Sequence, residues 1–393
     1  MKILLVHNRY LHAGGEDAAF LQEAALLRRH GHDVREYAED NRRISEIGWP
    51  SAAVRAVWSS GTRVRLRDLI RRERPQVAHF HNTFPLISPS AYWACRETDT
   101  PVVQTLHNYR LLCAAALFFR SGRPCEDCMG TRTLWPGVLH ACYRGSRLQT
   151  AGVTLMLETH RMLGTWRNRV DLFIALSEFS RRKFIEGGIA EERIALKPNF
   201  VHPDPGPGRA EGDFALFVGR LSIEKGVKVL LDAWRNLPQC PLAVCGDGPM
   251  REQVNRFAEA RLPGAVRVHG ALARQEVFDL MKKARFLVFP STCYESFPMA
   301  IAEAFACGLP VVSTDIGTPA EIVHAGRTGV FFRSGDPQSL AAAVDRLWAR
   351  PAETRRMGGE ARAEFLARYT AEANYARLME IYSRARGGGG GRT

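Results

Sequence analysis

The sequence predicts an α/β protein with two Rossmann-like domains that face a cleft. Apolar runs bounded by turn residues alternate with helical patterns along the chain, which is typical of parallel sheets covered by helices. The length of 393 residues is natural for two domains and long for a single core. A stiff, polar and helix-free segment at 202–209 separates two series of such elements, and we interpret it as a linker.

The first series of elements begins at the N-terminus. Residues 2–7 are predicted to form a strand and residues 17–30 a helix. Short apolar runs that end in polar residues predict further strands at 77–81, 102–106, 171–176 and 194–197. We therefore assign residues 1–201 to a first domain with a parallel sheet.

The second series of elements follows the linker. Its predicted strands, with helices between them, lie at 214–218, 242–245, 266–269, 286–289, 311–313 and 330–332. We assign residues 210–368 to a second domain. In open parallel sheets ligands bind beyond the carboxyl ends of the strands, so we expect the site at those ends.

The composition indicates an anionic partner and a reducing compartment. The net charge of +13 suits a nucleotide, a nucleic acid or an anionic membrane surface. No nucleic-acid motif accompanies the charge, so we expect no nucleic-acid partner. No run reaches the roughly 18 apolar residues of a membrane span, and the apolar start is too short for a signal peptide. Nine cysteines, several in apolar strands, fit a cytoplasmic protein better than a disulfide framework.

The most informative segment is 294–310. Glu295 and Glu303 stand eight positions apart, across a predicted helix that starts near Ser296 and Pro298. Eight helical residues span about 12 Å, roughly the reach from the sugar to the ribose of a nucleoside-diphosphate sugar. The helix N-terminus between them favours an anion. The segment therefore predicts that the two carboxylates bind both ends of such a donor. The alternative is a solvated helix with two exposed carboxylates.

A second constellation supplies positive charge. Arg220 and Lys225 lie five positions apart in the loop that leads from the strand at 214–218 into the helix at 227–234. Arginine can fork onto phosphate oxygens, and lysine supplies a point charge. Fixed cations of this kind can stabilise a departing diphosphate without a divalent metal. The alternative is a basic turn that binds no ligand.

Segments 219–226 and 294–310 together resemble the signatures of retaining glycosyltransferases with the GT-B fold, in particular of glycosyltransferase family 4. The resemblance covers nearly the whole chain and is strongest in 214–315. It implies a nucleoside-diphosphate sugar as donor, held by the second domain, and an acceptor presented by the first. It further implies retention of configuration at the sugar and chemistry that requires no cofactor.

The resemblance also implies residue roles for the donor. Glu295 would hydrogen-bond the sugar hydroxyls, and Glu303 would accept from both ribose hydroxyls. Arg220 and Lys225 would hold the diphosphate. His107, at the end of a first-domain strand, would lie near the reaction centre. We expect Glu295, Arg220, Lys225 and His107 to carry the chemistry.

Other positions match segments that line the donor site in the family. Gly14 and Gly15 follow the first strand, where glycines let the backbone approach a phosphate closely. Asn108 stands where the family usually has an acid after the histidine. The remaining donor-binding positions that the resemblance implies are Ser177, Asn199, Gly246, Ala271, Leu272, Phe297 and Pro298. Each of these also fits a strand-end turn with no ligand.

The end of the chain has a separate prediction. Residues 369–386 have the length and apolar spacing of a helix. The resemblance implies that this helix crosses back onto the first domain, and packing on its own domain is the alternative. The glycine run within 387–393 predicts a disordered tail.

Four cysteines form a cluster in a predicted insertion at 113–142 of the first domain. A two-residue gap separates the central pair, and four thiolates within about 30 residues can close a tetrahedral zinc site. We predict a structural zinc bound by Cys113, Cys125, Cys128 and Cys142. The alternatives are four reduced thiols or a redox pair.

A basic stretch at 55–74 interleaves arginines with Trp58, Leu66, Leu69 and Ile70. Such a stretch can lie on an anionic bilayer, where a lipid-linked acceptor would wait. The alternative is a solvated helix face. The first reading predicts a protein that is peripheral on the inner face of the cell membrane.

The sequence therefore predicts a retaining hexosyltransferase that moves a sugar from a nucleoside-diphosphate sugar to a hydroxyl of a sugar or lipid-linked acceptor. Such an activity fits polysaccharide or glycolipid synthesis. One alternative is a nucleotide-sugar epimerase on the same fold, and another is a non-catalytic scaffold of a polysaccharide assembly. A dehydrogenase is disfavoured, because Gly14 and Gly15 lack the spaced third glycine of a dinucleotide turn.

Overall fold

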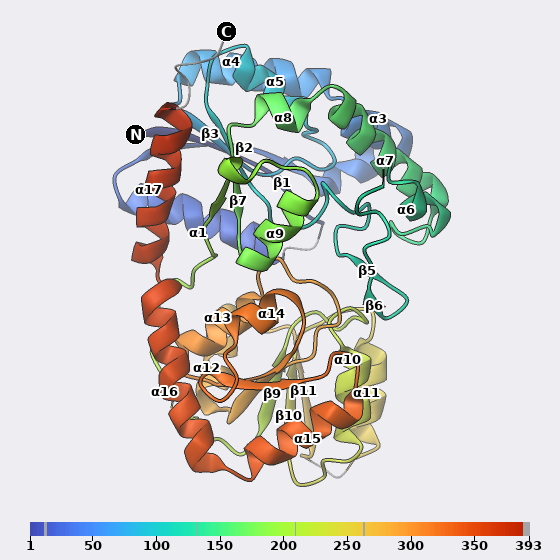
Figure 1. Cartoon of the computed structure of the whole chain (residues 1–393), viewed down its shortest axis with the longest axis vertical. Coiled ribbons are helices and arrows are strands. Elements are labelled where there is room, and N and C mark those ends of the chain that lie inside the picture. The colour runs from blue at the N-terminus through green and yellow to red at the C-terminus, as the bar shows by residue number, and fades with distance from the viewer. Residues whose placement is uncertain (12–13, 132, 209, 262–263, 388–393) are drawn as a thin grey trace. The chain divides into compact units, whose positions relative to one another are not determined.

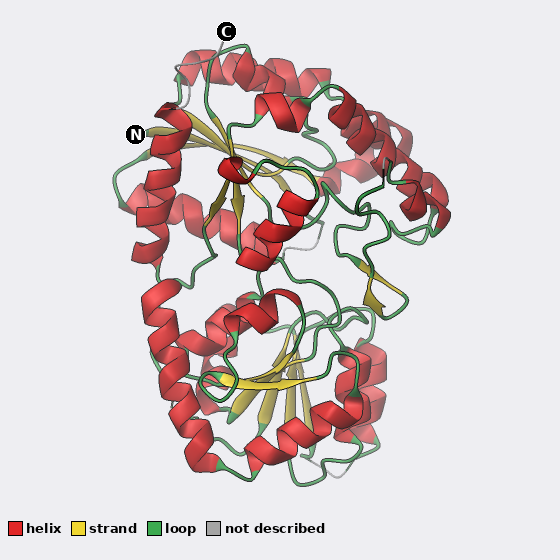
Figure 2. Ribbon diagram, viewed as in Figure 1, coloured by secondary structure: helices red, strands yellow, loops and turns green. Residues whose placement is uncertain are grey.

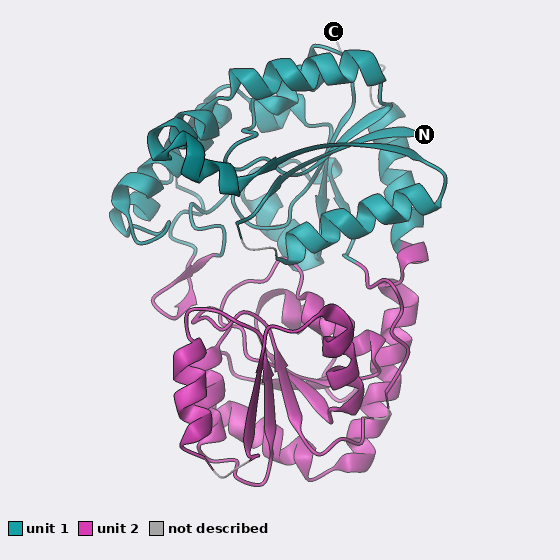
Figure 3. Ribbon diagram, turned by 180° about the vertical axis from the view of Figure 1, so that it is seen from behind, with its two compact units in different colours: residues 1–117, 126–199, 374–393 teal, residues 118–125, 200–373 magenta. Residues whose placement is uncertain are grey.

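Figures 1 and 2 show the computed structural model of the chain, which describes residues 1–11, 14–131, 133–208, 210–261 and 264–387. The chain forms two compact units, coloured separately in Figure 3. Unit 1 comprises Met1–Leu117, Glu126–Asn199 and the chain from Asn374 onward, and unit 2 comprises Phe118–Cys125 and Phe200–Ala373. Each unit contains a six-stranded parallel sheet with helices on both sides, which confirms the predicted class of two Rossmann-like domains.

The sheet of unit 1 has the strand order β2-β1-β3-β4-β7-β8. Its strands are β1 (Lys2–Arg9), β2 (Asp33–Asp40), β3 (Val77–Asn82), β4 (Val102–Thr105), β7 (Leu172–Ala175) and β8 (Ile194–Leu196). The central strands β3, β4 and β7 are buried along their whole length, as apolar runs in a covered parallel sheet should be. Strand β2 lies at the sheet edge and was not predicted from the sequence.

Helices cover both faces of the unit 1 sheet. They are α1 (Gly15–Arg29), α2 (Ile44–Ile47), α3 (Trp49–Val57), α4 (Ser60–Glu73), α5 (Ala91–Arg96), α6 (Trp135–Leu139), α7 (Arg147–Met162), α8 (Thr165–Arg169), α9 (Glu178–Glu186) and most of α17 (Ala371–Gly387), with 3-10 turns at Asn41–Arg43 and Glu191–Arg193. Within the described residues, no helix is both long and apolar enough to cross a bilayer.

The sheet of unit 2 has the order β11-β10-β9-β12-β13-β14. Its strands are β9 (Ala215–Val218), β10 (Leu242–Cys245), β11 (Val266–Gly270), β12 (Phe286–Phe289), β13 (Val311–Thr314) and β14 (Gly329–Phe332). The helices around it are α10 (Val227–Trp234), α11 (Arg251–Glu259), α12 (Arg274–Lys283), α13 (Met299–Ala306), α14 (Gly317–Ile322), α15 (Pro337–Trp348) and α16 (Pro351–Arg368). Side chains such as Phe217, Leu230 and Val344 form its buried core.

The unit boundaries differ from the predicted ones, since unit 2 begins its long segment at Phe200 and takes in the predicted linker. The predicted insertion at 113–142 does not stay together, because its short antiparallel pair β5 (Phe119–Arg120) and β6 (Arg123–Pro124) belongs to unit 2. The last helix belongs to unit 1 from Asn374 onward rather than from residue 369. The predicted tail at 387–393 lies outside the described residues except for Gly387, which ends α17, and Arg209 of the predicted linker lies outside them too.

Helix α17 is held to unit 1 by side chains along its length. The Tyr382 hydroxyl lies 2.8 Å from His79 Nδ1, and the Tyr375 hydroxyl lies 2.8 Å from His32 Nε2. Asn374 donates to the carbonyl of Pro198 at 2.6 Å. Tyr382 is fully buried, so the C-terminal helix completes the core of unit 1.

Candidate functional site

The centre of the candidate site in unit 2 is an ion pair between Lys225 and Glu295. Lys225 Nζ lies 2.7 Å and 2.9 Å from the two carboxylate oxygens of Glu295. The Ser291 hydroxyl donates to Glu295 Oε1 at 2.7 Å, and Thr318 donates to the Glu295 carbonyl at 2.6 Å. Burial opposes the charge of Lys225, yet Glu295 raises the pKa of this lysine above its ordinary value. The structure thus brings together two residues that lie 70 positions apart in the sequence.

Glycines set the shape of the loops that carry this pair. Gly226 has a φ of +73°, and a Cβ there would meet the carbonyl oxygen of Pro290 at 1.8 Å. Gly246 has a φ of +144°, and its Cβ would lie 1.9 Å from the carbonyl oxygen of Gly219. Both positions therefore require glycine. Gly246, one of the predicted donor-binding residues, thus packs its backbone directly against Gly219, the residue before Arg220.

Arg220 stands at the carboxyl end of β9 with an exposed side chain. In the part of the chain that the structure describes, it makes no ion pair. It is therefore available to an anion, whereas Lys225 is already shared with Glu295. Ala271 and Leu272 follow β11 at the same edge of the sheet, and the Gly246 amide donates to the carbonyl of Gly270 at 2.7 Å.

The second predicted carboxylate, Glu303, lies within α13 and contacts an unpredicted partner. Arg274, at the start of α12, places Nε 3.3 Å from Glu303 Oε1 and donates to the His202 carbonyl at 2.8 Å. Burial raises the pKa of Glu303 above its ordinary value, although Arg274 works in the opposite direction. No local pattern marks Arg274, because it lies 29 positions before Glu303.

The start of α13 differs from the sequence prediction. The helix begins at Met299 with Pro298 in the capping position, and Ser296 does not cap it. The ring of Phe297 is buried and packs against Tyr369, with ring centroids 5.7 Å apart. A contact of Phe297 with a donor would therefore come from its backbone.

In unit 1 the predicted residues follow the strands of the sheet. His107 comes after β4, and its Nε2 lies 2.9 Å from His81 Nδ1. The Gly14 amide donates to Asp17 at 3.0 Å. A Cβ on Gly14 would meet nothing within 4 Å, so the backbone at Gly14 is accessible to a ligand.

Two further predicted residues of unit 1 are buried. Ser177 caps α9, where it accepts from the Ser180 amide. Asn199 is a buried residue at the end of unit 1.

A buried carboxyl group lies beside Asn108, and it was not predicted from the sequence. Glu16 Oε2 accepts from the Tyr10 hydroxyl at 2.9 Å and lies 3.3 Å from Asn108 Nδ2. Its other oxygen is buried without a hydrogen-bond partner among the described residues. Burial raises the pKa of Glu16 from an ordinary value near 4.5 to about 8. The raised pKa favours the protonated form of Glu16 near pH 7, where the carboxyl group contacts Asn108.

Replacement of Glu16 with glutamine is expected to raise the melting temperature more at pH 8.5 than at pH 5. The raised pKa means that the folded state holds this proton more tightly than the unfolded state, so stability falls as the pH rises from about 4.5 to about 8. Glutamine stays neutral and removes that loss. Thermal unfolding of both proteins at the two pH values measures the effect, and Glu36→Gln, at an exposed pair with Arg28, is the control. Equal shifts at both pH values would contradict the raised pKa.

The four cysteines of the predicted zinc site form no disulfide among the described residues. Among the described residues, no three of their sulfurs lie within 4.8 Å of one another. Cys113 is buried, and Cys128 packs against the apolar cluster around Leu134 and Met156. The zinc site stays a prediction, and this arrangement of thiols does not support it.

The predicted basic stretch forms parts of α3 and α4. Leu66 and Ile70 are buried inside unit 1, so the apolar face of α4 is already covered by protein. Arg65 pairs with Glu39 at 3.0 Å, and Arg63 pairs with Glu97. The structure therefore favours the solvated helix face over a surface that inserts into a membrane.

Family models cover most of the chain. Residues 205–364 match the model described as glycosyl transferases group 1, and residues 13–205 match the model described as Glycosyltransferase Family 4. Over 212 residues the chain is 31% identical to the uncharacterized glycosyltransferase MJ1178 of Methanocaldococcus jannaschii. The aligned segment makes up 54% of this chain and 59% of that protein. Over 356 residues the chain is 26% identical to glycogen synthase of Mycobacterium tuberculosis, and the aligned segment makes up 87% of this chain and 77% of that protein.

Solved structures share the fold. Anabaena Alr3699/HepE in complex with UDP-glucose superposes with a TM-score of 0.68 at 18% identity, over 98% of this chain and 100% of that one. Sucrose-phosphate synthase of Thermosynechococcus elongatus superposes with a TM-score of 0.70 at 17% identity, over 98% of this chain and 99% of that one. The two matched segments and the two Rossmann-like sheets together identify the chain as a glycosyltransferase of the group 1 type with the GT-B fold.

Proposed function

We propose that the chain is a retaining glycosyltransferase of glycosyltransferase family 4. It transfers a hexosyl group from a nucleoside-diphosphate sugar to a hydroxyl of a sugar or lipid-linked acceptor, in the synthesis of a polysaccharide or glycolipid. The observation that carries the proposal is the pair of Lys225 and Glu295 in the same unit and near the same sheet edge as the exposed Arg220. An anion and a polyhydroxylated group can be bound there together.

Two comparisons support the choice of substrates. HepE was solved with UDP and with UDP-glucose, so a uridine-diphosphate sugar is our proposed donor. Glycogen synthase and the O-antigen chain mannosyltransferase C of Escherichia coli both have names that refer to polysaccharides, which supports a polymeric or lipid-linked acceptor.

In the proposed reaction the bond between the anomeric carbon and the diphosphate oxygen breaks. The acceptor oxygen forms its bond to that carbon on the same face of the sugar, and its proton passes to an oxygen of the leaving diphosphate. Arg220 and Lys225 stabilise the negative charge that develops on the diphosphate, which is the role that a metal ion would otherwise have. Glu295 accepts hydrogen bonds from the sugar hydroxyls and orients the ring.

Replacement of Glu303 with glutamine is expected to weaken UDP binding about tenfold to a hundredfold, since hydrogen bonds to a charged group contribute about 1.5–3 kcal/mol. Glutamine keeps the shape and an oxygen for Arg274, but it replaces one acceptor with a donor. Isothermal titration with UDP measures the change. Glu252→Gln, on the surface of α11, is the matched control and should bind UDP like the wild type.

The products of the reaction separate a transferase from an epimerase. A transferase that is incubated with UDP-glucose and an acceptor releases UDP and yields a glycosylated acceptor. An epimerase would convert the donor into a different UDP-sugar without any acceptor. Unchanged UDP binding in Glu303→Gln, or conversion of the donor alone, would contradict the proposed function.

A further inference from the structure

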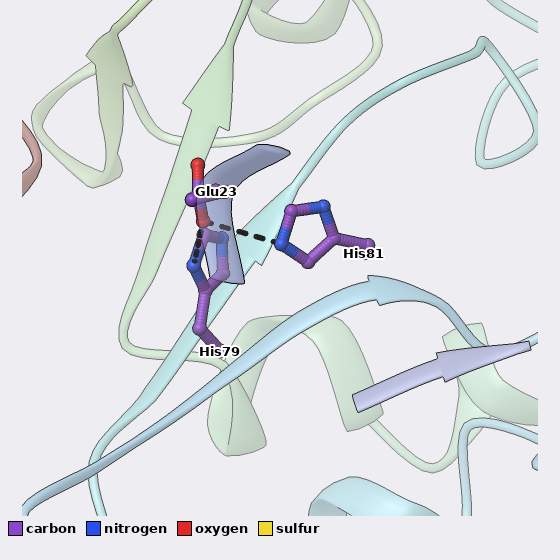
Figure 4. A group of neighbouring side chains, drawn as sticks. All are labelled: Glu23, His79 and His81. Atoms are coloured by element: carbon purple, nitrogen blue, oxygen red, sulfur yellow. Dashed lines mark ion pairs between the residues drawn. The ribbon is translucent and has the colours of Figure 1, made fainter. Parts of the chain in front are cut away.

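Unit 1 contains a line of buried polar side chains that the proposed reaction does not use. Glu23 comes from α1, His79 and His81 from β3, and Lys197 follows β8; all four are buried. Figure 4 shows the Glu23 carboxylate next to the two imidazole rings. Glu23 Oε1 lies 2.8 Å from His79 Nδ1 and 3.2 Å from His81 Nε2, while Lys197 Nζ lies 2.9 Å from Glu23 Oε2.

The charges in this line follow from the contacts. Burial opposes the ionisation of Glu23, but Lys197 and the two histidines hold the pKa of this carboxyl well below its ordinary value. Burial lowers the pKa of His81 to about 4, and burial together with His81 lowers the pKa of His107 well below its ordinary value. Near pH 7 Glu23 is therefore a carboxylate, and His81 and His107 are neutral imidazoles.

These charges indicate which ring nitrogens carry hydrogen. His81 Nε2 lies 3.2 Å from Glu23 Oε1, and neither atom has a hydrogen-bond partner among the described residues. The negative charge of the carboxylate favours a hydrogen on the ring nitrogen that faces it, which is Nε2. A neutral imidazole carries one hydrogen, so His81 Nδ1 is an acceptor, and it lies 2.9 Å from His107 Nε2. His107 therefore carries its hydrogen on Nε2 and has a lone pair on Nδ1.

We propose that Glu23 is a positioning residue that acts through His81 to hold His107 in the Nε2–H tautomer. The Nδ1 atom of His107 then accepts a hydrogen bond from a hydroxyl group of the substrate. This proposal rests on the proposed function for the identity of that substrate. It is supported by the place of His107 at the carboxyl end of β4, where its side chain is only half-buried. In the described ranges of the chain, Nδ1 of His107 has no hydrogen-bond partner.

A divalent metal is the competing explanation for this cluster. One ligand atom from each of Glu23, His79 and His81 lies within 4.8 Å of the other two. However, Lys197 already neutralises the carboxylate, and the Tyr382 hydroxyl already lies 2.8 Å from His79 Nδ1. A metal ion would add two uncompensated positive charges in a buried site, which is costly. The charge balance with Lys197 therefore accounts for the cluster better than metal binding does.

The tautomer of His107 is expected to stay the same between pH 6 and pH 8. The titratable and charged groups that surround His81 in the described residues are His7 on β1, Glu23 on α1, His79 on β3, His107 after β4, Lys197 after β8 and Tyr382 on α17. The shifted pKa values of Glu23, His81 and His107 all lie below this interval.

The test measures the tautomer in the intact protein with ¹⁵N-labelled histidine, by spectra that correlate ring protons with ring nitrogens. His107→Gln assigns the signals of His107. We expect the wild type to show Nε2–H and an unprotonated Nδ1. In His81→Phe the partner of His107 is lost, so the signals should change to a mixture of tautomers. His79→Gln is the matched control, because His79 contacts the same carboxylate but not His107, and the tautomer should stay fixed.

A second variant covers the case in which His81→Phe does not fold. The double substitution Glu23→Leu with Lys197→Met removes both charges together and replaces them with apolar groups of similar size, which is often tolerated. It should also release the tautomer of His107. Both variants should bind UDP-glucose about fivefold more weakly while binding of UDP stays the same, since one neutral hydrogen bond to the sugar is lost.

Three outcomes would overturn the proposal. They are an Nδ1–H tautomer in the wild type, a fixed Nε2–H tautomer in the variants that lack Glu23 or His81, and stoichiometric uptake of added Zn²⁺ that His79→Gln abolishes. The tautomer is measured without substrate, so it is independent of the proposed reaction. A protein with the expected tautomer but no sugar transfer would overturn the proposed function and leave the positioning of His107 intact.

Discussion

Replacement of Lys225 with alanine is expected to lower the turnover of sugar transfer about a hundredfold to a thousandfold, the range found when one fixed group that stabilises transition-state charge is removed. Lys225 Nζ is the group that contacts both oxygens of Glu295, at 2.7 Å and 2.9 Å. Its loss removes the positive charge that we propose faces the diphosphate, and it removes the cation that pairs with Glu295, the carboxylate that we propose orients the sugar. Both effects act on the same step, so we expect them to add little to each other.

The kinetic constants distinguish a role in the transition state from a role in binding. If Lys225 acts mainly as the departing diphosphate gains charge, kcat and kcat/KM should fall by similar factors. Lys228→Ala is the matched control, because Lys228 lies three positions further on, is exposed, and pairs with Asp232 on the same helix. Wild-type turnover in Lys225→Ala, or an equal loss in Lys228→Ala, would remove the role that we assign to Lys225.

The sheets could largely be predicted from the sequence, because strands buried on both faces carry continuous apolar runs. Strand β2 could not, since Asp33–Asp40 is rich in charged residues. Its place at the edge of the sheet explains this composition: β2 pairs with β1 alone, and several of its side chains remain exposed. An edge strand with a charged face has no apolar signal that separates it from a loop.

The contact between Lys225 and Glu295 agrees with a donor site that could be proposed from the sequence, because the proposed residues occur in compact motifs. Glu295 and Lys225 each lie in a recognisable loop, and the structure brings them into contact. The partners that were missed lie far apart in the sequence. Lys197 lies 174 positions from Glu23 in the sequence. The pair forms because Lys197 follows β8, the edge strand of the sheet, and the order of the strands in a sheet cannot be predicted from local sequence patterns.

Loss of the Lys197 charge alone is expected to produce the largest change in stability. Lys197→Met leaves Glu23 as a buried carboxylate without its cation, and breaking such a pair costs about 3–5 kcal/mol. Both side chains are almost fully buried, at 2% and 4% exposed, so solvent cannot compensate for the loss. For a unit of this size, that cost corresponds to a fall of about 10 °C in melting temperature.

The double variant separates the cost of an unpaired charge from the value of the pair. Glu23→Leu with Lys197→Met should recover most of the lost stability, because an apolar pair needs no compensation. Lys2→Met removes a lysine that is 33% exposed and pairs loosely with Asp33 at 3.7 Å and with Glu73 at 3.6 Å, so it should cost less than about 1 kcal/mol. Chemical unfolding of the three variants and the wild type measures these differences in the free energy of unfolding. If Lys197→Met were as harmless as Lys2→Met, Glu23 would be stable without its cation, and the carboxylate that orients His81 would have to be protonated.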